Sequence, residues 1–253
     1  MRRLLCVAAC LLVPSTFWAT DKSLGPLVGD RPDFSESAET IARGHVQLEA
    51  GTTFESSDGD IDAFSFGELL IRIGLARSWE LRVALNSYLE IDTPTERVSG
   101  VRNPSLEAKF RFNPASEGLA VALLFGTTVP VGYSDIGSEQ EQPFAKLLLG
   151  HDFRGRLSLG ANVGYARPFL EETRFDQYIA SLSLGIEVSE RVGTYAEVFG
   201  LSRELSGGDP ASFFDAGVTY LLTRNLQLDA RIGSGLGGTE LGWFGGVGVV
   251  KRW

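Results

Sequence analysis

The chain has 253 residues, 43% of them hydrophobic, with 23 Lys and Arg against 32 Asp and Glu and a net charge of -9. The hydrophobic fraction excludes a disordered acidic chain, and the absence of a basic cluster argues against binding to nucleic acid. No apolar run reaches the roughly 18 residues of a membrane helix, which leaves a soluble globular protein or a β-barrel.

The N-terminus has the order of a secretory signal peptide. Arg2 and Arg3 precede an apolar stretch from Leu4 to Val13, and small or polar residues then lead to Ala19. Because the apolar stretch is shorter than the roughly 20 residues of a spanning helix, we expect residues 1–19 to be a signal peptide cleaved near Ala19. Its removal would take away both cysteines, Cys6 and Cys10. The expected mature protein is therefore exported and is not a disulfide-stapled scaffold.

Residues 20–43 show no strand pattern and contain Pro26, Pro32 and several charges. Two interpretations are open for this N-terminal periplasmic segment. It is a plug or cap over the opening of a barrel formed by residues 44–253, or it is an unstructured leader.

From residue 46 onward, apolar and polar residues alternate with a period of two. The first four runs cover 46–54, 69–75, 79–86 and 106–112, and each has an apolar face opposite a polar face that in most runs carries full charges. Such strands suit a half-exposed sheet or a barrel with lipid outside and water inside. Further runs bring the expected strands to twelve: 118–129, 143–151, 156–166, 177–188, 191–201, 212–222, 225–233 and 241–253.

The connections between these runs alternate between short and long. Longer segments fall at 55–65, 89–102, 130–142, 167–176, 202–211 and 234–240, and they are rich in Asp and Glu. This alternation is typical of an outer-membrane barrel, whose periplasmic turns are short and whose outer loops are long. We therefore predict an all-β, transmembrane, up-and-down antiparallel barrel of about twelve strands, with long acidic outer loops and both termini on the periplasmic side.

The acidic loops raise the question of a metal site. Clustered carboxylates are the ligands of calcium, and two loops hold such clusters: Glu55, Asp58, Asp60 and Asp62 in one, and Asp135, Glu139 and Glu141 in the other. Neither has a fixed ligand spacing around a tight glycine turn. A solvated acidic surface is the favoured interpretation, and we predict no metal and no cofactor.

Aromatic residues mark the expected membrane edges. Near the short turns or the C-terminus lie Trp79, Phe112, Phe153 and Trp253, and near the long loops lie Phe54, Phe144, Tyr165, Tyr178 and Trp243. Together they are expected to form the two interfacial girdles of a barrel surrounded by outer-membrane lipid.

Strand parity predicts which charged side chains face the lumen. The channel-lining candidates are Glu49, Glu68, Arg72, Glu80, Arg82, Glu107, Lys109, Arg111, Lys146, Glu187, Glu197, Asp215, Asp229 and Arg231. Opposite charges on a shared interior suggest ion-pair ladders along a narrow, wet channel. The favoured interpretation for any one residue is bracing between neighbouring strands, with a role in selectivity as the alternative.

Several segments, which together cover most of the expected mature chain, carry a resemblance to a known family. Asp30-Arg31-Pro32-Asp33-Phe34-Ser35-Glu36-Ser37, followed by Gly44-His45-Val46-Gln47-Leu48-Glu49-Ala50-Gly51, resembles the opening of the bacterial outer-membrane family named for a MetA pathway of phenol degradation. The resemblance marks Asp30, Arg31, Pro32 and Asp33 as family-motif residues. It implies a transporter-like outer-membrane barrel, in a family sometimes linked to pathways for aromatic compounds.

The last strand is similar to the C-terminal assembly signal of outer-membrane barrels. Val247, Val249 and Trp253 have the required parity, whereas Lys251 stands where an apolar residue is usual. A lysine can extend its amine to the interface. The similarity implies recognition by the outer-membrane barrel assembly machinery.

These observations predict a channel that allows passage of small solutes, including aromatic or other small organic compounds, and no enzyme. The first alternative is an outer-membrane lipid hydrolase or protease, which needs a catalytic base. Only His45 and His151 are available, both expected near the periplasmic end, and no Gly-x-Ser-x-Gly elbow or zinc-ligand pair occurs. The second alternative is a structural or surface-recognition barrel whose acidic loops bind partners.

Overall fold

The computed structural model describes residues 25–253 except 58–60, 115–117, 132–135 and 154–155. The expected signal peptide, its cleavage point at Ala19 and the loop carboxylates Asp58, Asp60 and Asp135 lie outside the described residues.

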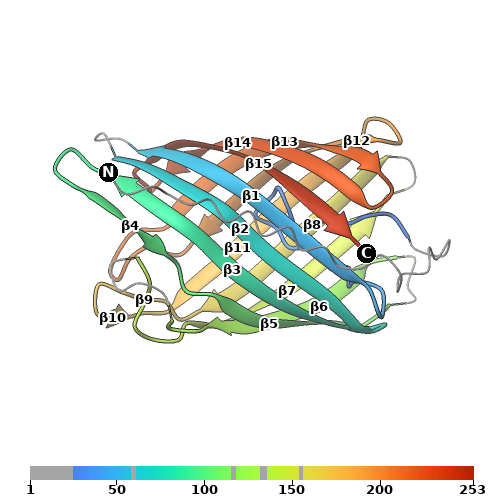
Figure 1. The fold of residues 1–253 in the computed structure, drawn as a ribbon, viewed down its shortest axis with the longest axis horizontal. Helices are drawn as coiled ribbons and strands as arrows, with labels where there is room; N and C mark the ends of the chain where they lie inside the picture. The colour runs from blue at the N-terminus through green and yellow to red at the C-terminus, as the bar shows by residue number, and fades with distance from the viewer. Residues whose placement is uncertain (1–24, 58–60, 115–117, 132–135, 154–155) are drawn as a thin grey trace, which may run out of the picture.

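Twelve antiparallel strands close into a barrel, in which each strand pairs with its neighbour along the chain and the last pairs with the first (Figure 1). This confirms the predicted fold class and strand number. The strands are β1 (Val46–Ser57), β2 (Ile61–Ala76), β3 (Trp79–Asp92), β5 (Ser105–Arg111), β6 (Ala120–Thr128), β7 (Pro143–Asp152), β8 (Leu157–Ala166), β11 (Gln177–Glu187), β12 (Val192–Leu201), β13 (Ala211–Thr223), β14 (Leu226–Gly237) and β15 (Leu241–Arg252).

Three short strands lie within segments expected to be loops. β4 (Arg97–Val101) pairs with the end of β3, and β9 (Phe169–Leu170) pairs with β10 (Thr173–Arg174). β5 pairs with residues 79–84 of β3 and β4 with residues 88–92. Two strands in succession thus occupy the same edge of β3, which a count of alternating runs could not show.

Several strands also extend further toward the loop end than the apolar alternation indicated. β1 continues to Ser57, β2 begins at Ile61 and β14 continues to Gly237, so most of the expected loops 55–65 and 234–240 are strand, whereas β15 begins at Leu241 as expected. Backbone pairing does not require apolar side chains, and a ladder can continue after the alternation has ended.

One glycine changes the face that β2 presents. Gly67 has a φ of 75°, and the pairing of β2 with β1 shifts register between Glu49 and Thr52. A residue at positive φ in such an irregularity is typical of a β-bulge and favours glycine. Across this bulge Ser65 is buried, whereas Phe66 is 64% exposed.

The outer face of the barrel is apolar and the inner face is largely polar. On β11 the exposed Leu182 and Leu184 alternate with the buried Ser181 and Ser183. This is the alternation of a barrel in lipid. Within the described residues, no helix is long and apolar enough to cross a bilayer.

Most of the aromatic residues named above are exposed or half-buried, but the placement of Phe144 in an outer girdle was wrong. Phe144 packs against a buried apolar cluster on the inner wall, formed by Ala38, Ala120, Ala122, Leu124 and Leu148. Phe144 lies two residues from Lys146 on β7, so the parity that placed Lys146 in the lumen applies to Phe144 as well.

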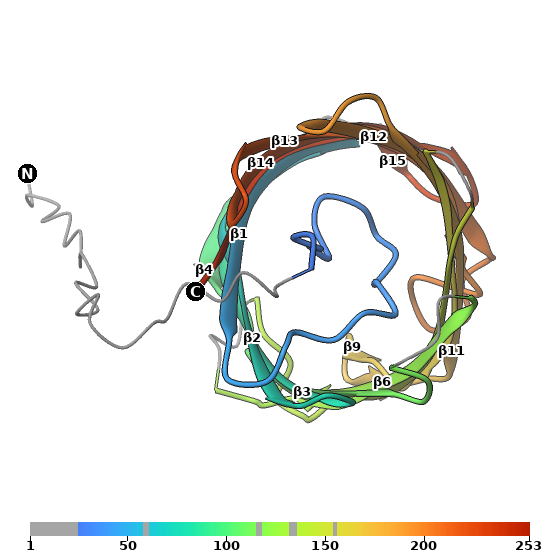
Figure 2. The same ribbon diagram turned by 90° about the vertical axis from the view of Figure 1, so that its right-hand side faces the viewer.

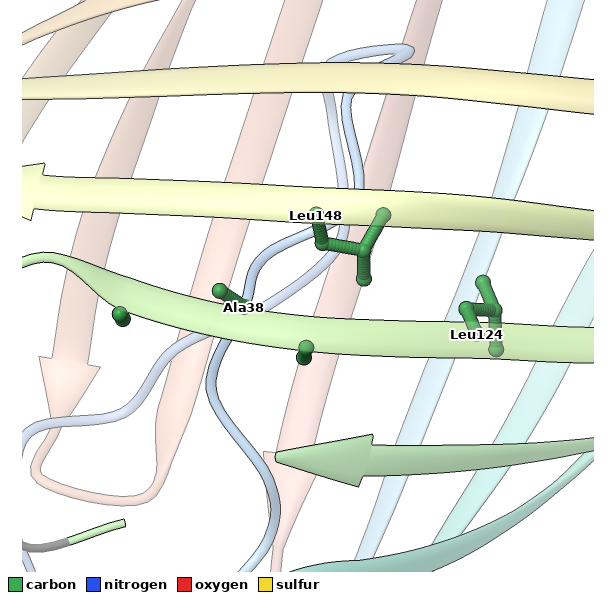
Figure 3. Close-up of a cluster of buried hydrophobic side chains, with 5 residues drawn as sticks. Ala38, Leu124 and Leu148 are labelled. Atoms are coloured by element: carbon green, nitrogen blue, oxygen red, sulfur yellow. The ribbon is translucent and has the colours of Figure 1, made fainter. Parts of the chain in front are cut away.

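Residues 25–43 run through the interior of the barrel rather than along its outside (Figure 2). Ala38 of this inserted segment contacts the inner wall near Leu124 and Leu148 (Figure 3). Gly44 then joins the barrel, since its N–H donates to the carbonyl of Gly74 over 2.9 Å.

Candidate functional site

The candidate site is the lumen together with the inserted segment, residues 25–43. Three strands place cations on one part of its wall. Arg72 on β2 lies opposite Arg82 on β3 in the strand register, and Lys109 on β5 lies opposite Glu80 on β3. Inward parity directs all three basic side chains into the lumen, where they are almost completely buried.

Wall carboxylates partly neutralise this basic cluster. Arg72 contacts Glu80 through Nε at 2.7 Å and Glu49 through Nη1 at 3.0 Å. Arg82 Nε lies 2.8 Å from Glu107 Oε2. Buried charges are tolerated when they are paired and hydrogen-bonded, and these contacts meet that requirement.

Asp30 of the inserted segment places one carboxylate oxygen among all three cations. Its Oδ2 lies 3.1 Å from Arg72 Nη1, 2.5 Å from Arg82 Nη1 and 3.1 Å from Lys109 Nζ. Its Oδ1 accepts the backbone N–H of Ser37 at 2.8 Å. Burial alone would raise the pKa of Asp30, but the three cations and this hydrogen bond hold it well below its usual range.

Arg31 points to a different part of the wall. Gly51 of β1 and Gly248 of β15 lie opposite each other, and a Cβ at either position would lie only 2.2–2.3 Å from the Arg31 guanidinium group. Because neither glycine has a side chain, a slot is left between them that is wide enough for the Arg31 side chain. In this slot Arg31 contacts Glu68 at 2.7 Å and Asp229 at 3.5 Å.

The rest of the inserted segment is held mainly by side chains of the wall. Glu36 contacts Arg82 at 2.7 Å and Lys146 at 3.7 Å, and Glu39 contacts Arg111. Backbone N–H groups of the segment donate to wall side chains. These are Asp30 and Arg31 to Glu49, Phe34 and Ser35 to Glu197, Glu36 to Asn162, and Ile41 to Glu80.

An acidic cluster lies on a separate part of the wall. Glu197 of β12 and Asp215 of β13 are opposite each other in register, and Asp215 accepts the hydroxyl of Tyr195 at 3.1 Å. Asp33 of the segment accepts the Ser183 hydroxyl at 3.4 Å. Burial, and then the charge of Glu197, raise the pKa of Asp33 well above its usual value, with smaller contributions from Asp30 and Asp215.

Two cavities adjoin the segment. The larger, about 730 Å³, is lined by Asp33, Glu36, Glu39 and the ends of β7, β8, β11 and β12 toward their short turns. The smaller, about 240 Å³, is lined by Arg31, Glu36, Glu68, Arg82 and Glu107. Arg31 and Glu36 line both cavities, so both spaces border the inserted segment.

The structure brings most of the predicted channel-lining residues to the inner wall. Ten of them are buried: Glu49, Arg72, Glu80, Arg82, Glu107, Lys109, Arg111, Glu197, Asp215 and Asp229. Glu68, Lys146 and Arg231 are half-buried, and Arg231 lies 5.3 Å from the Phe244 ring centre. Glu187 is exposed at the end of β11, where it lines the larger cavity.

The family-motif residues Asp30, Arg31, Pro32 and Asp33 all belong to the inserted segment. The segment also contacts three wall residues that were not predicted as channel-lining, Gln47, Asn162 and Arg252. Gln47 donates to the Val28 carbonyl at 2.9 Å, and Arg252 donates to the carbonyls of Gly25 and Pro26 at 3.0 Å. Inward parity on β1, β8 and β15 was the available signal, because it put these polar side chains on the lumen face.

Both histidines lie near the short-turn end. His45 Nδ1 is 2.8 Å from the carbonyl oxygen of Trp253, and the His151 ring packs edge-on against Phe153 at 4.6 Å. Among the described residues, no group of three or more His, Cys, Asp or Glu could hold a metal ion.

The comparisons with known proteins agree with this architecture. The family described as "Putative MetA-pathway of phenol degradation" matches residues 29–253. The fold is similar to an outer-membrane channel of the COG4313 group from Pseudomonas putida F1, with a TM-score of 0.67, 13% identity, and coverage of 85% of this chain and 98% of that one.

Two porins have the same fold. The NanC porin has a TM-score of 0.58 and 12% identity, covering 81% of this chain and 98% of its own. The KdgM porin has a TM-score of 0.53 and 14% identity, covering 80% and 98%. No curated protein sequence matches the chain.

Proposed function

The chain belongs to the outer-membrane family described as "Putative MetA-pathway of phenol degradation", and from that premise we propose that it is a passive channel for small solutes, including small organic compounds. The observation that carries the proposal is the lumen itself. It is polar, and it holds cavities of about 730 and 240 Å³ beside a segment that does not belong to the sheet.

We further propose that residues 20–43 act as a plug. The described part of this segment is held in the lumen by ion pairs and hydrogen bonds to wall side chains, as given above. Such contacts can be broken without disturbing the strand ladder. The barrel is therefore expected to stay closed while the segment moves.

The test compares the full-length mature protein with a variant lacking residues 20–36, both reconstituted in lipid. Liposome swelling with arabinose, glycine and benzoate measures passage, and planar-bilayer recording measures the conductance of single channels. We expect passage of small solutes by both proteins and a larger single-channel conductance for the deletion variant, because removing the segment widens the lumen.

Each result bears on one part of the proposal. If no solute enters liposomes containing either protein, the channel function is wrong. If both proteins permeate and have equal conductance, the plug is wrong and the channel stands. A heat-modifiability gel, which separates folded from unfolded barrels, serves as the folding control for both.

The positions of the two histidines and of the last strand suggest their roles. His45 and His151 hold neighbouring groups at the short-turn end, and we assign them a structural role and no catalytic one. Trp253 ends a strand that closes the barrel against β1, and recognition of this strand by the barrel assembly machinery is part of the proposal.

A further inference from the structure

Asp30 occupies a site in which three wall cations bind its carboxylate. Arg72, Arg82 and Lys109 come from three strands of the wall, are each at most 2% exposed, and converge on a single oxygen of Asp30 at 2.5–3.1 Å. Charge-assisted contacts of this kind are the strong ones, and arginine is suited to carboxylates by its planar donor geometry. The low pKa of Asp30 shows that the site favours the ionised form.

The part of the wall that contacts Asp30, Glu36 and Glu39 retains positive charge when the segment is left out. It carries five cations, Arg72, Arg82, Lys109, Arg111 and Lys146, against three carboxylates, Glu49, Glu80 and Glu107, which leaves an excess of two positive charges. Glu68 pairs with Arg31, and Glu197, Asp215 and Asp229 lie on other parts of the wall. The segment supplies three carboxylates to these cations, from Asp30, Glu36 and Glu39. Without them, this part of the wall would attract anions.

The site adjoins an open space. Arg82, which contacts Asp30, also lines the 240 Å³ cavity together with Arg31, Glu36, Glu68 and Glu107. A solute in this cavity therefore lies beside one of the residues that bind Asp30. A bound carboxylate could replace that of Asp30 with no change in the number of charges.

We propose that Arg72, Arg82 and Lys109 form a carboxylate-binding site of the channel, that Asp30 fills it while the segment is in place, and that a small organic carboxylate takes its place during passage. This inference rests on the proposed channel function. It names small organic carboxylates as the preferred solutes, and it makes the segment a competitor for the same cations.

The first test measures binding to the full-length mature protein in detergent by isothermal titration. Benzoate is the probe, and benzamide is the neutral control of the same size. In Asp30→Asn the competing charge is lost, so we expect benzoate to bind about tenfold more tightly than to the unsubstituted protein, since a larger fraction of the site is free. Equal affinity for benzoate in the two proteins would overturn the proposal, as would benzamide binding as well as benzoate.

The second test removes one cation. Lys109→Gln is expected to lose the benzoate binding gained in Asp30→Asn when the two are combined. Arg97→Gln is the matched control because it removes the same charge from an exposed pair outside the lumen, and it should leave benzoate binding unchanged. Retained binding in the combined variant would overturn the site. Asp30→Asn leaves the wall intact and keeps the test valid if Lys109→Gln does not fold.

Arabinose swelling separates this inference from the channel function. Arabinose entry together with equal binding of benzoate and benzamide to Asp30→Asn would overturn the carboxylate site and leave the channel standing. Absence of arabinose, glycine and benzoate entry would overturn the channel and, with it, the preferred solute.

Discussion

Adjacent residues of the inserted segment contact different parts of the wall. Asp30 contacts the cations of β2, β3 and β5, whereas Arg31 lies in the slot between Gly51 and Gly248. Two neighbouring side chains of opposite charge therefore fix the position of the backbone between them. Asp33, three residues later, faces Glu197 and Asp215 and has no ion-pair partner within the described part of the chain.

Asp33 predicts a pH dependence of the plug. An acid whose pKa is raised favours the seated state in its protonated form, so its contribution is complete below its ordinary pKa of 3.8 and is lost as the pH rises through the raised value. The contribution of Asp30 has the opposite sign. Its pKa is lowered, so this contribution is present above 3.8 and is lost only in strong acid.

We therefore expect the single-channel conductance of the unsubstituted protein to increase as the pH rises above 3.8, the ordinary pKa of Asp33. Asp33→Asn should remove most of this increase and lower the conductance at the higher pH, because the amide stays neutral. Asp176→Asn, which changes an exposed loop carboxylate, is the control and should keep the original profile. An unchanged profile in Asp33→Asn would contradict this assignment.

At the scale of the elements, the strands were predictable and the inserted segment was not. Alternation identified all twelve strands of the barrel because water and lipid impose opposite requirements on successive residues. Alternation did not predict the inner face of β6, where Ala122 and Leu124 are buried although they are apolar. It also did not predict residues 61–66 of β2, which precede Gly67, because the bulge there changes which residues face the lumen. Residues 25–43 have no period, and their position depends on side-chain contacts made by distant strands.

Movement of the inserted segment during solute passage can be tested by attaching the segment to the wall. The only cysteines of the chain, Cys6 and Cys10, lie in the expected signal peptide, and the hydroxyl oxygens of Ser35 and Ser181 are 2.7 Å apart. We expect the double variant Ser35→Cys, Ser181→Cys to form a disulfide that holds the segment against β11. Passage in swelling assays should fall on oxidation and recover on reduction.

Each single cysteine variant is the control for this experiment and should not respond to reduction. Equal passage by the oxidised and reduced double variant would show that solutes pass beside a stationary segment, which would contradict displacement of the plug.

At the scale of the whole molecule, the barrel separates two solvents. Leu182, near the middle of β11, is 48% exposed, and Val188, just beyond the strand, is 51% exposed. The two side chains are similarly exposed but have different surroundings, because the middle of the strand faces hydrocarbon and its end faces the membrane interface. Their effects on stability should differ accordingly.

Leu182→Arg is expected to lower the free energy of unfolding by about 2–4 kcal/mol, whereas Val188→Arg should lower it by about 0–1 kcal/mol. Denaturant titration in lipid vesicles, followed by tryptophan fluorescence, measures both. Equal losses of stability would show that β11 does not lie across the bilayer as inferred.

The closure of β1 on β15 has a consequence for the order of folding. The slot for Arg31 is formed by Gly51 of β1 and Gly248 of β15, and Arg252 of β15 holds the carbonyls of Gly25 and Pro26. The slot is complete only when the first and last strands pair. The N-terminal segment is synthesised before any strand, and we expect Arg31 to reach its final position only after the barrel has closed.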